Sequence, residues 1–506
     1  MVGLARMCMT AVPTVARMVA RMVARRVPPM VGPARICMTA VRMVARMVAR
    51  RVPPMVGPAR MCMTAVPTVA PRARQLTVDP DMIAGSTDGG AETSCPAAPG
   101  LGRILQRLVS VSTETFANSY WSTHPLVSRA TATGSDFSQL FSAAAVDELV
   151  SRRGLRTPFV RMARQGEVLT ASTFTRSGGT GAGIADQVAD DKVLGLLADG
   201  ATLVLQGLHR TWPPLIEFGS TLSGELGHPV QINAYVTPPQ NRGFAPHYDT
   251  HDVFVVQVSG GKRWLIHEPV LVDPLPNQTS EQRREAVSAR ACEPALMDVT
   301  LKPDDVLYLP RGFLHSASAL GETSIHLTIG VHPITRHTLA RELLRCAGEL
   351  PELRKSLPMG VDLSDPQVLA GQLRTTADLL TATASVDPRR IEEIAGRVGA
   401  ELARSTRPMP ISPLTQVEAL ARVTRDTPLR LRSGLRVSSR RTGGSLVLKW
   451  LDKQVTLPVS NEPAVRFVLN AEPLAARDLP GLDQDEQLDL VRRLLREAIV
   501  VPISGE

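Results

Sequence analysis

The sequence predicts a mainly β fold, a closed barrel or a sandwich with flanking helices, followed by an all-α segment and a smaller α+β module. Three observations predict this. Between residues 230 and 333, short apolar strands alternate with tight turns. Residues 334–408 carry amphipathic helical patterns and no strand pattern. Residues 409–506 mix helical patterns with two strand-like stretches, a composition that suits a winged-helix-like module.

The strand pattern is clearest in the stretch VQINAYV, which begins at Val230. Successive side chains of a strand point to opposite faces, so this alternation predicts one apolar and one polar face. The polar face carries amide and phenol groups, from Gln231, Asn233 and Tyr235. We therefore expect these groups to line a pocket or solvent rather than the core.

Residues 251–269 predict two strands joined at Gly260-Gly261, a common two-residue hairpin turn. Further strands are predicted within 297–319 and 323–333. Upstream, the patterns predict helices at 104–121, 142–153, 191–200 and 213–227, and strands at 157–163 and 201–208. Gly227 is expected to end the helix that precedes it.

The first 74 residues are an internal repeat rich in Arg and Met, with MVGLARMCMTAVPTVA at Met1, MVGPARICMTAV at Met30 and MVGPARMCMTAVPTVA at Met55. Proline at the unit boundaries opposes a long helix, and no charged-then-apolar-then-cleavage layout of a signal peptide is present. We interpret 1–74 as low-complexity and disordered, with a targeting or membrane-surface segment as the alternative. Residues 75–103 are predicted to be a linker.

The net charge of +9 is a poor guide to partners, because residues 1–78 contain thirteen arginines and no Asp, Glu or Lys. Without those thirteen charges, residues 79–506 carry a net charge of −4. A basic surface for nucleic acid is therefore not expected. The basic run at 430–441 is interpreted as a solvated loop, with phosphate contacts as the alternative.

Other bulk features agree with a cytoplasmic protein. No apolar run is long enough to cross a bilayer, so no membrane association is expected. Outside the repeat, Cys95, Cys292 and Cys346 have no metal-ligand spacing and are interpreted as free thiols in a reducing compartment.

The chemistry is predicted from His247-Tyr248-Asp249, where residues i and i+2 of an extended chain present an imidazole and a carboxylate on one side. A second segment, DDVLYLPRGFLHSA, ends a strand and carries His315. In a barrel, His315 could join the first pair. Two imidazoles and one carboxylate leave coordination positions open, an arrangement that suits non-haem Fe(II) and O₂ chemistry.

Three segments resemble the JmjC-type cupin proteins that include the ribosomal oxygenases. They are NAYVTPP, PHYDTHDVFVVQVSGGKRW and DDVLYLPRGFLHSA. The resemblance implies a double-stranded β-helix (cupin barrel) over 104–333, a helical dimerisation domain over 334–408, and a winged-helix-like domain over 409–506. It implies a homodimer formed through 334–408.

The resemblance also implies roles for individual residues. His247, Asp249 and His315 match the Fe(II) ligands. Lys262 matches the basic residue that pairs with the distal carboxylate of 2-oxoglutarate. Asn233, Tyr235 and Thr328 match residues of the co-substrate pocket. From the residues alone, Lys262 is an exposed hairpin lysine, since a straight strand would carry it far from His247.

Other histidines are given lesser roles. We expect His251 to support the site or its rim, and His326 to face the pocket without binding the metal. His267, His332 and His337 are expected to be structural or solvent-facing, and Trp264 and Phe254 to be packing residues.

The leading hypothesis is a protein hydroxylase that uses Fe(II), 2-oxoglutarate and O₂ and releases succinate and CO₂. The resemblance implies a His or Arg side chain of a ribosomal protein as the target. Two alternatives stay open. One is an oxygenase acting on a small molecule, a peptide or tRNA, and the other is a non-catalytic cupin and winged-helix regulator that senses a ligand.

Overall fold

The structure, a computed structural model, describes residues 103–181, 183–384 and 388–503. The predicted repeat (1–74) and the predicted linker (75–103), apart from Arg103, lie outside this range. All described residues belong to one compact unit. Among them, no helix has the length and apolar character needed to span a membrane. Cys292 and Cys346 are free thiols, as predicted.

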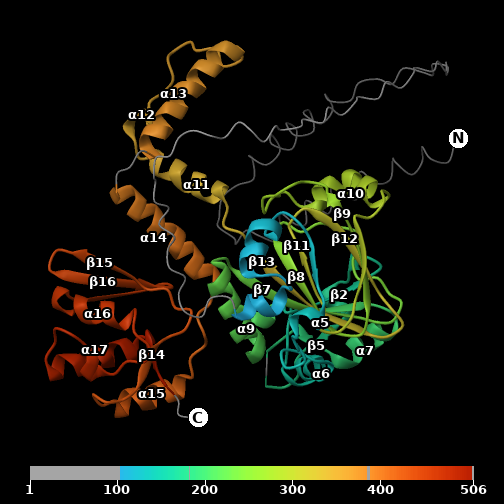
Figure 1. Cartoon of the computed structure of the whole chain (residues 1–506), viewed down its shortest axis with the longest axis horizontal. Coiled ribbons are helices and arrows are strands. Elements are labelled where there is room, and N and C mark those ends of the chain that lie inside the picture. Colours follow the sequence, from blue (N-terminus) through green and yellow to red (C-terminus); the bar gives the residue numbers. More distant parts are fainter. Residues whose placement is uncertain (1–102, 182, 385–387, 504–506) are drawn as a thin grey trace, which may run out of the picture. The chain divides into compact units, whose positions relative to one another are not determined.

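The centre of the fold is a pair of antiparallel sheets. The larger has eight strands in the order β1-β11-β8-β13-β7-β6-β2-β3, and the smaller has three in the order β10-β9-β12. Side chains of both sheets, including Val253, Trp264 and Phe313, share one hydrophobic cluster, so the sheets face each other (Figure 1). The strands are β1 (Leu126–Ser128), β2 (Val160–Arg164), β3 (Glu167–Val168), β6 (Thr202–Leu205), β7 (Val230–Thr237), β8 (Asp252–Ser259), β9 (Lys262–Pro269), β10 (Met297–Leu301), β11 (Val306–Leu309), β12 (Phe313–Ala319) and β13 (Ser324–Val331).

Helices and short strands surround these sheets. They are α3 (Arg103–Leu108), α4 (Thr113–Thr115), η1 (Phe116–Tyr120), α5 (Ala130–Thr133), α6 (Ala143–Arg152), η2 (Ala171–Thr173), β4 (Thr175–Arg176), β5 (Gln187–Val188), α7 (Asp190–Ala198), α8 (Leu208–Thr211), α9 (Pro213–Leu226), η3 (Ser280–Arg283) and α10 (Arg284–Ala291). The apolar sides of α3, α6 and α9 pack into the main core. Gly227 ends α9 in the left-handed conformation, as predicted.

Strand β7 has the predicted alternation of apolar and polar side chains. Its apolar residues Ile232 and Ala234 are fully buried, whereas Asn233 and Tyr235 are only partly buried. In the register with β13, Asn233 lies opposite Thr328 and Tyr235 lies opposite His326. The polar faces of two neighbouring strands therefore form one continuous polar surface inside the barrel.

The predicted hairpin at Gly260-Gly261 is wrong. Strand β8 pairs with β11 and β13 in the larger sheet, whereas β9 pairs with β10 and β12 in the smaller one. Gly260-Gly261 is thus a corner between sheets. Gly260 has a φ of +65°, and a Cβ there would lie 2.4 Å from the Thr323 carbonyl oxygen. The side-chain amide of Gln257 donates to the Ser259 and Gly260 carbonyls and closes the corner.

The continuous helix predicted for 104–121 is also wrong, because the chain breaks between α3 and α4. Ser112 is extended, and its hydroxyl accepts a hydrogen bond from the Thr115 backbone N–H. Ser110 donates its backbone N–H to the Ser128 hydroxyl instead of continuing the helix. Serine side chains that compete for backbone groups explain the break.

Residues 334–405 form the helices α11 (Arg336–Ala347), α12 (Pro351–Arg354), α13 (Pro366–Ala384) and α14 (Pro388–Ser405). Beyond them, a separate hydrophobic core that includes Trp450, Val465 and Leu494 holds the last elements together. These are α15 (Pro413–Arg422), β14 (Leu429–Leu431), β15 (Ser438–Thr442), β16 (Ser445–Trp450), β17 (Lys453–Pro458), η4 (Val459–Asn461), α16 (Glu462–Val468), η5 (Ala476–Asp478), α17 (Gln484–Arg496) and β18 (Val500–Pro502).

Candidate metal centre

The three predicted metal ligands come from two chain segments that lie side by side. Residues 247–249 lie in the connection between β7 and β8, and His315 lies in β12. The His247 N–H donates to the His315 carbonyl at 3.1 Å, and the His315 N–H donates to the His247 carbonyl at 2.9 Å. The Gly312 N–H adds a bond to the Asp249 carbonyl at 3.0 Å. Backbone pairing therefore sets the separation of the ligands.

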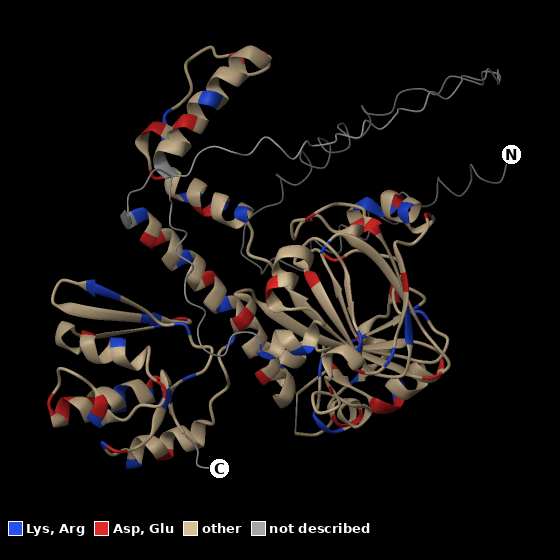
Figure 2. Ribbon diagram, in the orientation of Figure 1, with Lys and Arg blue, Asp and Glu red and all other residues tan. Residues whose placement is uncertain are grey.

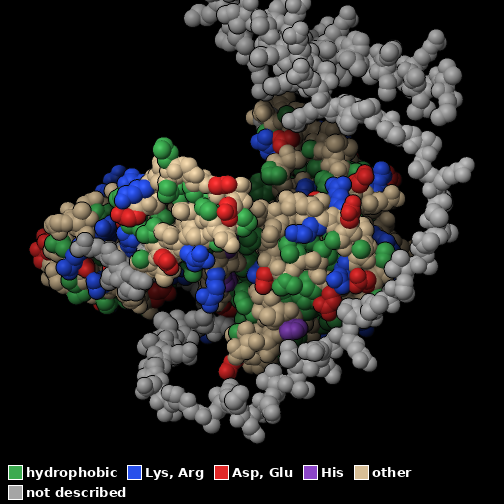
Figure 3. Space-filling model, turned by 90° about the horizontal axis from the view of Figure 1, so that it is seen from above, with side chains coloured by type: hydrophobic (Ala, Val, Ile, Leu, Met, Phe, Trp, Pro, Cys, Tyr) green, Lys and Arg blue, Asp and Glu red, His purple; other side chains and the backbone are tan. Residues whose placement is uncertain are grey.

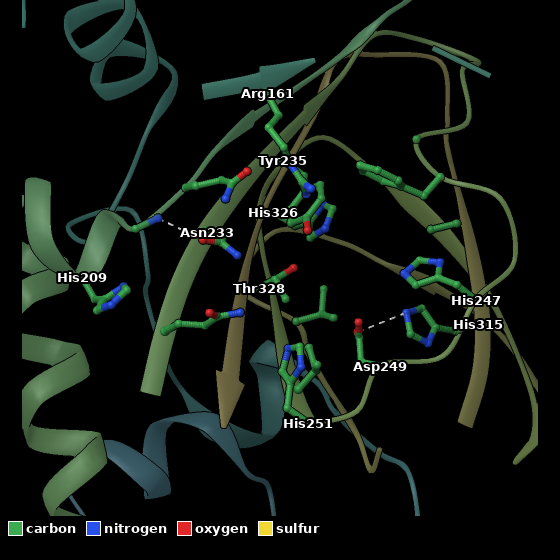
Figure 4. Close-up of a pocket in the computed structure, with 18 of the residues that line it drawn as sticks. Arg161, His209, Asn233, Tyr235, His247, Asp249, His251, His315, His326 and Thr328 are labelled. Carbon is green, nitrogen blue, oxygen red and sulfur yellow. Dashed lines mark hydrogen bonds and ion pairs between the residues drawn. The ribbon is translucent and has the colours of Figure 1, made fainter. Parts of the chain in front are cut away.

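Their side chains converge. One ligand atom each from His247, Asp249 and His315 lies within 4.8 Å of the other two, and His315 Nε2 is 3.7 Å from Asp249 Oδ2. Figure 4 shows the three side chains at one end of a cavity. Among the residues that the structure describes, these three form the cluster of His, Cys, Asp or Glu side chains that is spaced to hold a metal ion.

Hydrogen bonds orient both imidazoles. His247 Nδ1 lies 2.8 Å from the Ala245 carbonyl oxygen, and His315 Nδ1 lies 3.1 Å from the Phe313 carbonyl oxygen. A carbonyl oxygen only accepts, so each Nδ1 carries the proton and donates. Each Nε2 is then the nitrogen with a free lone pair, the arrangement that metal-binding histidines need.

The charges of the trio also suit a metal. Burial lowers the pKa of His315 to about 4, and the His247 charge lowers it further, so this imidazole is neutral near pH 7. Burial disfavours the charged form of Asp249, but the neighbouring imidazoles, His251 first, outweigh it and lower the carboxyl pKa. Two imidazole nitrogens and one carboxylate fit an ion such as Fe(II), with positions left for other ligands.

Lys262 lies in the same cavity, which has a volume of about 990 Å³. Its side chain is only 3% exposed. The ammonium donates to Thr237 Oγ1 at 3.0 Å and lies 3.4 Å from His326 Nδ1, and it forms no ion pair with any described carboxylate. Burial lowers its pKa to about 7. The reading of Lys262 as an exposed hairpin lysine is therefore wrong.

The other predicted pocket residues line the same cavity. Thr328 lies between the ligand trio and Asn233 (Figure 4). Asn233 Oδ1 accepts a hydrogen bond from the Gly207 N–H at 3.0 Å. Tyr235 stacks on His326 with ring centroids 5.0 Å apart, and burial raises its pKa to about 12, so its phenol is neutral.

Two histidines beside the trio form a stacked pair. The rings of His251 and His332 lie 4.8 Å apart, and both line the cavity. A Cβ at Gly330 would lie 2.6 Å from His251 Cδ2, so this glycine makes room for the ring. His326 faces the cavity as expected, and His251, which was expected to support the site or its rim, also lines it. His332 faces it as well, although it was expected to be structural or solvent-facing.

Sequence reasoning missed polar residues of the cavity, among them Arg161 and Gln206. Arg161 Nε and Gln206 Oε1 are buried without a hydrogen-bond partner in the structure. Arg161 lies 5.9 Å from the Phe244 ring centroid. An arginine inside the apolar strand pattern at 157–163 was the available signal for this site, because a charged residue seldom occupies such a position without a function.

Part of the chain is similar to known proteins. Residues 220–339 match the family model of the JmjC domain. The bifunctional lysine-specific demethylase and histidyl-hydroxylase NO66 of Drosophila persimilis is 36% identical over 139 residues, covering 26% of this chain and 19% of that protein. Ribosomal oxygenase 1 of Rattus norvegicus is 37% identical over 127 residues, covering 24% of this chain and 20% of that protein.

A longer alignment, with NO66 of Drosophila mojavensis, is 25% identical over 424 residues and covers 79% of this chain and 46% of that protein. The chain thus spans less than half the length of these curated relatives. Among solved structures, the ribosomal oxygenase YcfD of Escherichia coli matches with a TM-score of 0.46 and 18% identity, covering 78% of this chain and 99% of that chain.

The facing sheets and the domain match define a fold of the cupin class. Within that class, the chain carries a JmjC domain at residues 220–339. The predicted resemblance to ribosomal oxygenases is confirmed by its sequence similarity to them.

Proposed function

We propose that this protein is an Fe(II)- and 2-oxoglutarate-dependent oxygenase that hydroxylates a protein side chain. The observation that carries the proposal is the convergence of His247, Asp249 and His315 within 4.8 Å in a cavity that also buries Lys262. A buried ammonium without a carboxylate partner is costly, and an anionic co-substrate would supply the missing charge.

In the reaction, a C–H bond of the substrate, 2-oxoglutarate and O₂ give a hydroxyl group, succinate and CO₂. The bound Fe(II) supplies the oxygen chemistry. His247, Asp249 and His315 would hold it, and Lys262 would bind the distal carboxylate of 2-oxoglutarate. The Thr328 hydroxyl, the Asn233 amide and the Tyr235 phenol offer hydrogen bonds that orient the co-substrate.

The proposed substrate is a His or Arg side chain of a ribosomal protein, in line with the printed names of the relatives, which include a histidyl-hydroxylase and a ribosomal oxygenase. The cavity favours histidine. Arg161 lines it and has a buried Nε without a partner. A fixed guanidinium repels a substrate arginine but not a neutral imidazole.

The test is stoichiometric succinate formation in the presence of Fe(II), O₂ and ribosomal proteins, with mass spectrometry for a gain of one oxygen atom. Turnover should disappear in His247→Ala. Succinate release that is unchanged in this variant would overturn the proposal. If small molecules, free peptides or tRNA stimulate succinate formation and ribosomal proteins do not, the oxygenase activity is supported but the proposed substrate is wrong.

We further propose that residues 334–408 mediate a homodimer. Supporting this, α11 and α13 expose the apolar side chains of Leu339, Leu344 and Leu373, at 47, 56 and 59%. A dimer mass in light scattering that falls to the monomer mass in Leu373→Glu would support it, and a monomeric parent chain would contradict it. The winged-helix nature of 409–506 and a cytoplasmic location stay predictions.

A further inference from the structure

A second cavity of about 750 Å³ is lined by an unusual number of arginines. They are Arg210, Arg404, Arg407, Arg432 and Arg436. Asp452 is the one acidic residue among the residues that line it. No Phe, Tyr or Trp lines it, whereas the hydroxyls of Ser220, Ser223, Ser405 and Thr406 do. We call this cavity the arginine cleft.

The cleft is built by two loops that are distant in sequence. The Met409 N–H donates to the Ser433 carbonyl at 2.9 Å, and Arg432 Nε donates to the Met409 carbonyl at 2.7 Å. Gly434 has a φ of +72°, and a Cβ there would lie 3.4 Å from Pro408 Cα. This tight packing brings Arg404, in the last turn of α14, and Arg407 close to Arg432 and Arg436, which precede β15. Figure 2 marks the basic positions at the end of α14 and in the chain that follows.

Many other described arginines form ion pairs with carboxylates, whereas the cleft arginines do not. Arg397 pairs with Glu342 at 2.9 Å, and Arg156 pairs with Asp186 at 2.6 Å. By contrast, none of the five cleft arginines forms an ion pair with a carboxylate of the described residues. Burial lowers the pKa of Arg432, and the neighbouring charge of Arg407 lowers it further. Five guanidinium groups thus line the cleft with one carboxylate, that of Asp452, so the cleft has an excess of positive charge.

The cleft adjoins the candidate metal centre. His209, Arg210, Val230 and Ser405 line both cavities. Burial lowers the pKa of His209 to about 4, and the Arg210 charge adds to this effect, so the histidine is neutral. A ligand held by the arginines would thus lie beside the cavity of the candidate metal centre.

We propose that the arginine cleft binds the sugar-phosphate backbone of single-stranded RNA. Phosphate oxygens accept hydrogen bonds from guanidinium groups and hydroxyls. The cleft is also far larger than one phosphate needs. The imidazole of His209 is the one aromatic ring among the lining residues, which favours backbone contacts over extended base stacking. Asp452 would repel a phosphate but can accept a hydrogen bond from a ribose 2′-hydroxyl. The assignment does not depend on the proposed oxygenase activity.

This assignment differs from the expectation drawn from net charge. Residues 79–506 carry −4 overall, and Figure 3 shows acidic and basic side chains interspersed over the visible face. The cleft is a local exception, because folding brings together arginines separated by up to 226 positions in sequence, from Arg210 to Arg436.

The test compares two triple variants of the full-length chain that remove the same charge. The first is Arg404→Gln, Arg407→Gln and Arg436→Gln, at exposed cleft positions. The control is Arg374→Gln, Arg422→Gln and Arg440→Gln, at exposed positions outside the cleft that also lack ion pairs. Binding of a fluorescent 12-nucleotide oligouridylate is measured by anisotropy between about 50 and 200 mM salt, without iron or 2-oxoglutarate.

The cleft variant should bind at least tenfold more weakly, with a salt slope reduced by about 2, since each lost phosphate contact to a single strand removes about 0.7. The control should stay close to the parent chain. Equal losses in both variants would overturn the proposal. The thirteen arginines of residues 1–78 are present in all three chains, so they cancel in the comparison.

Two further measurements identify the ligand and the place of binding. Cross-linking with 4-thiouridine RNA should label peptides from 404–436, and labelling confined to 1–78 would overturn the assignment. Oligodeoxyuridylate or poly-glutamate that binds as tightly as the RNA would overturn the choice of RNA. Since no co-substrate is present, failure here leaves the succinate assay as an independent test of the oxygenase.

Discussion

His247 and His315 exchange two backbone hydrogen bonds, of 3.1 and 2.9 Å, and their ring centroids lie 4.5 Å apart. The connection between β7 and β8 is thus held against β12 at the point where the metal would bind. The imidazole positions are fixed by the backbone rather than by contacts between long side chains. A metal site of this kind is formed before the metal arrives.

The first prediction concerns the ligands. Because each contributes one of only three protein donors, His247→Ala or His315→Ala should lower Fe(II) affinity and succinate formation at least about 100-fold. Metal content and succinate are the measurements. His124→Ala is the control, since its ring contacts only the Ser119 carbonyl in an exposed position. Normal metal content in either ligand variant would contradict the assignment.

The second prediction concerns Lys262, whose pKa is lowered to about 7 by burial. Above that pH the ammonium is deprotonated in the free protein, whereas a bound carboxylate requires the charged form. Binding of 2-oxoglutarate must then take up a proton, so its Kd should rise by up to about tenfold per pH unit above 7. In Lys262→Arg the charge persists, so a similar pH dependence in both chains would contradict this role.

The third prediction concerns substrate choice. Removing the guanidinium in Arg161→Gln should raise turnover of an arginine-bearing peptide relative to its histidine counterpart by roughly tenfold, since like charges at close range in a protein repel by more than about 1 kcal/mol. Arg164→Gln, on the same strand but outside the cavity, is the control. An unchanged ratio in Arg161→Gln would show that Arg161 does not select the substrate.

The fourth prediction concerns the corner between the sheets. In Gly260→Ala, a left-handed backbone and a Cβ 2.4 Å from the Thr323 oxygen should cost more than about 3 kcal/mol and weaken 2-oxoglutarate binding through Lys262. Gly227→Ala, also left-handed but with open space around it, should cost only about 1 kcal/mol. Urea unfolding gives both values, and equal costs would contradict the steric argument.

The sequence by itself determined the local structure and the identity of the reactive groups. Alternation in β7 predicted which side chains face the core, and Gly227 marked the end of α9. The His-x-Asp pair and the later His315 were recognisable as a ligand set. These features depend on backbone geometry over a few residues, which the order of residues fixes directly.

The tertiary structure decided which segments meet. The local sequence around Gly260-Gly261 is the same whether the two strands form a hairpin or belong to different sheets. Only the pairing of β8 with β13 and of β9 with β12 distinguishes the two cases. That choice buries Lys262. Likewise, net charge is a sum over the chain, whereas the potential in the arginine cleft depends on distances that exist only after folding.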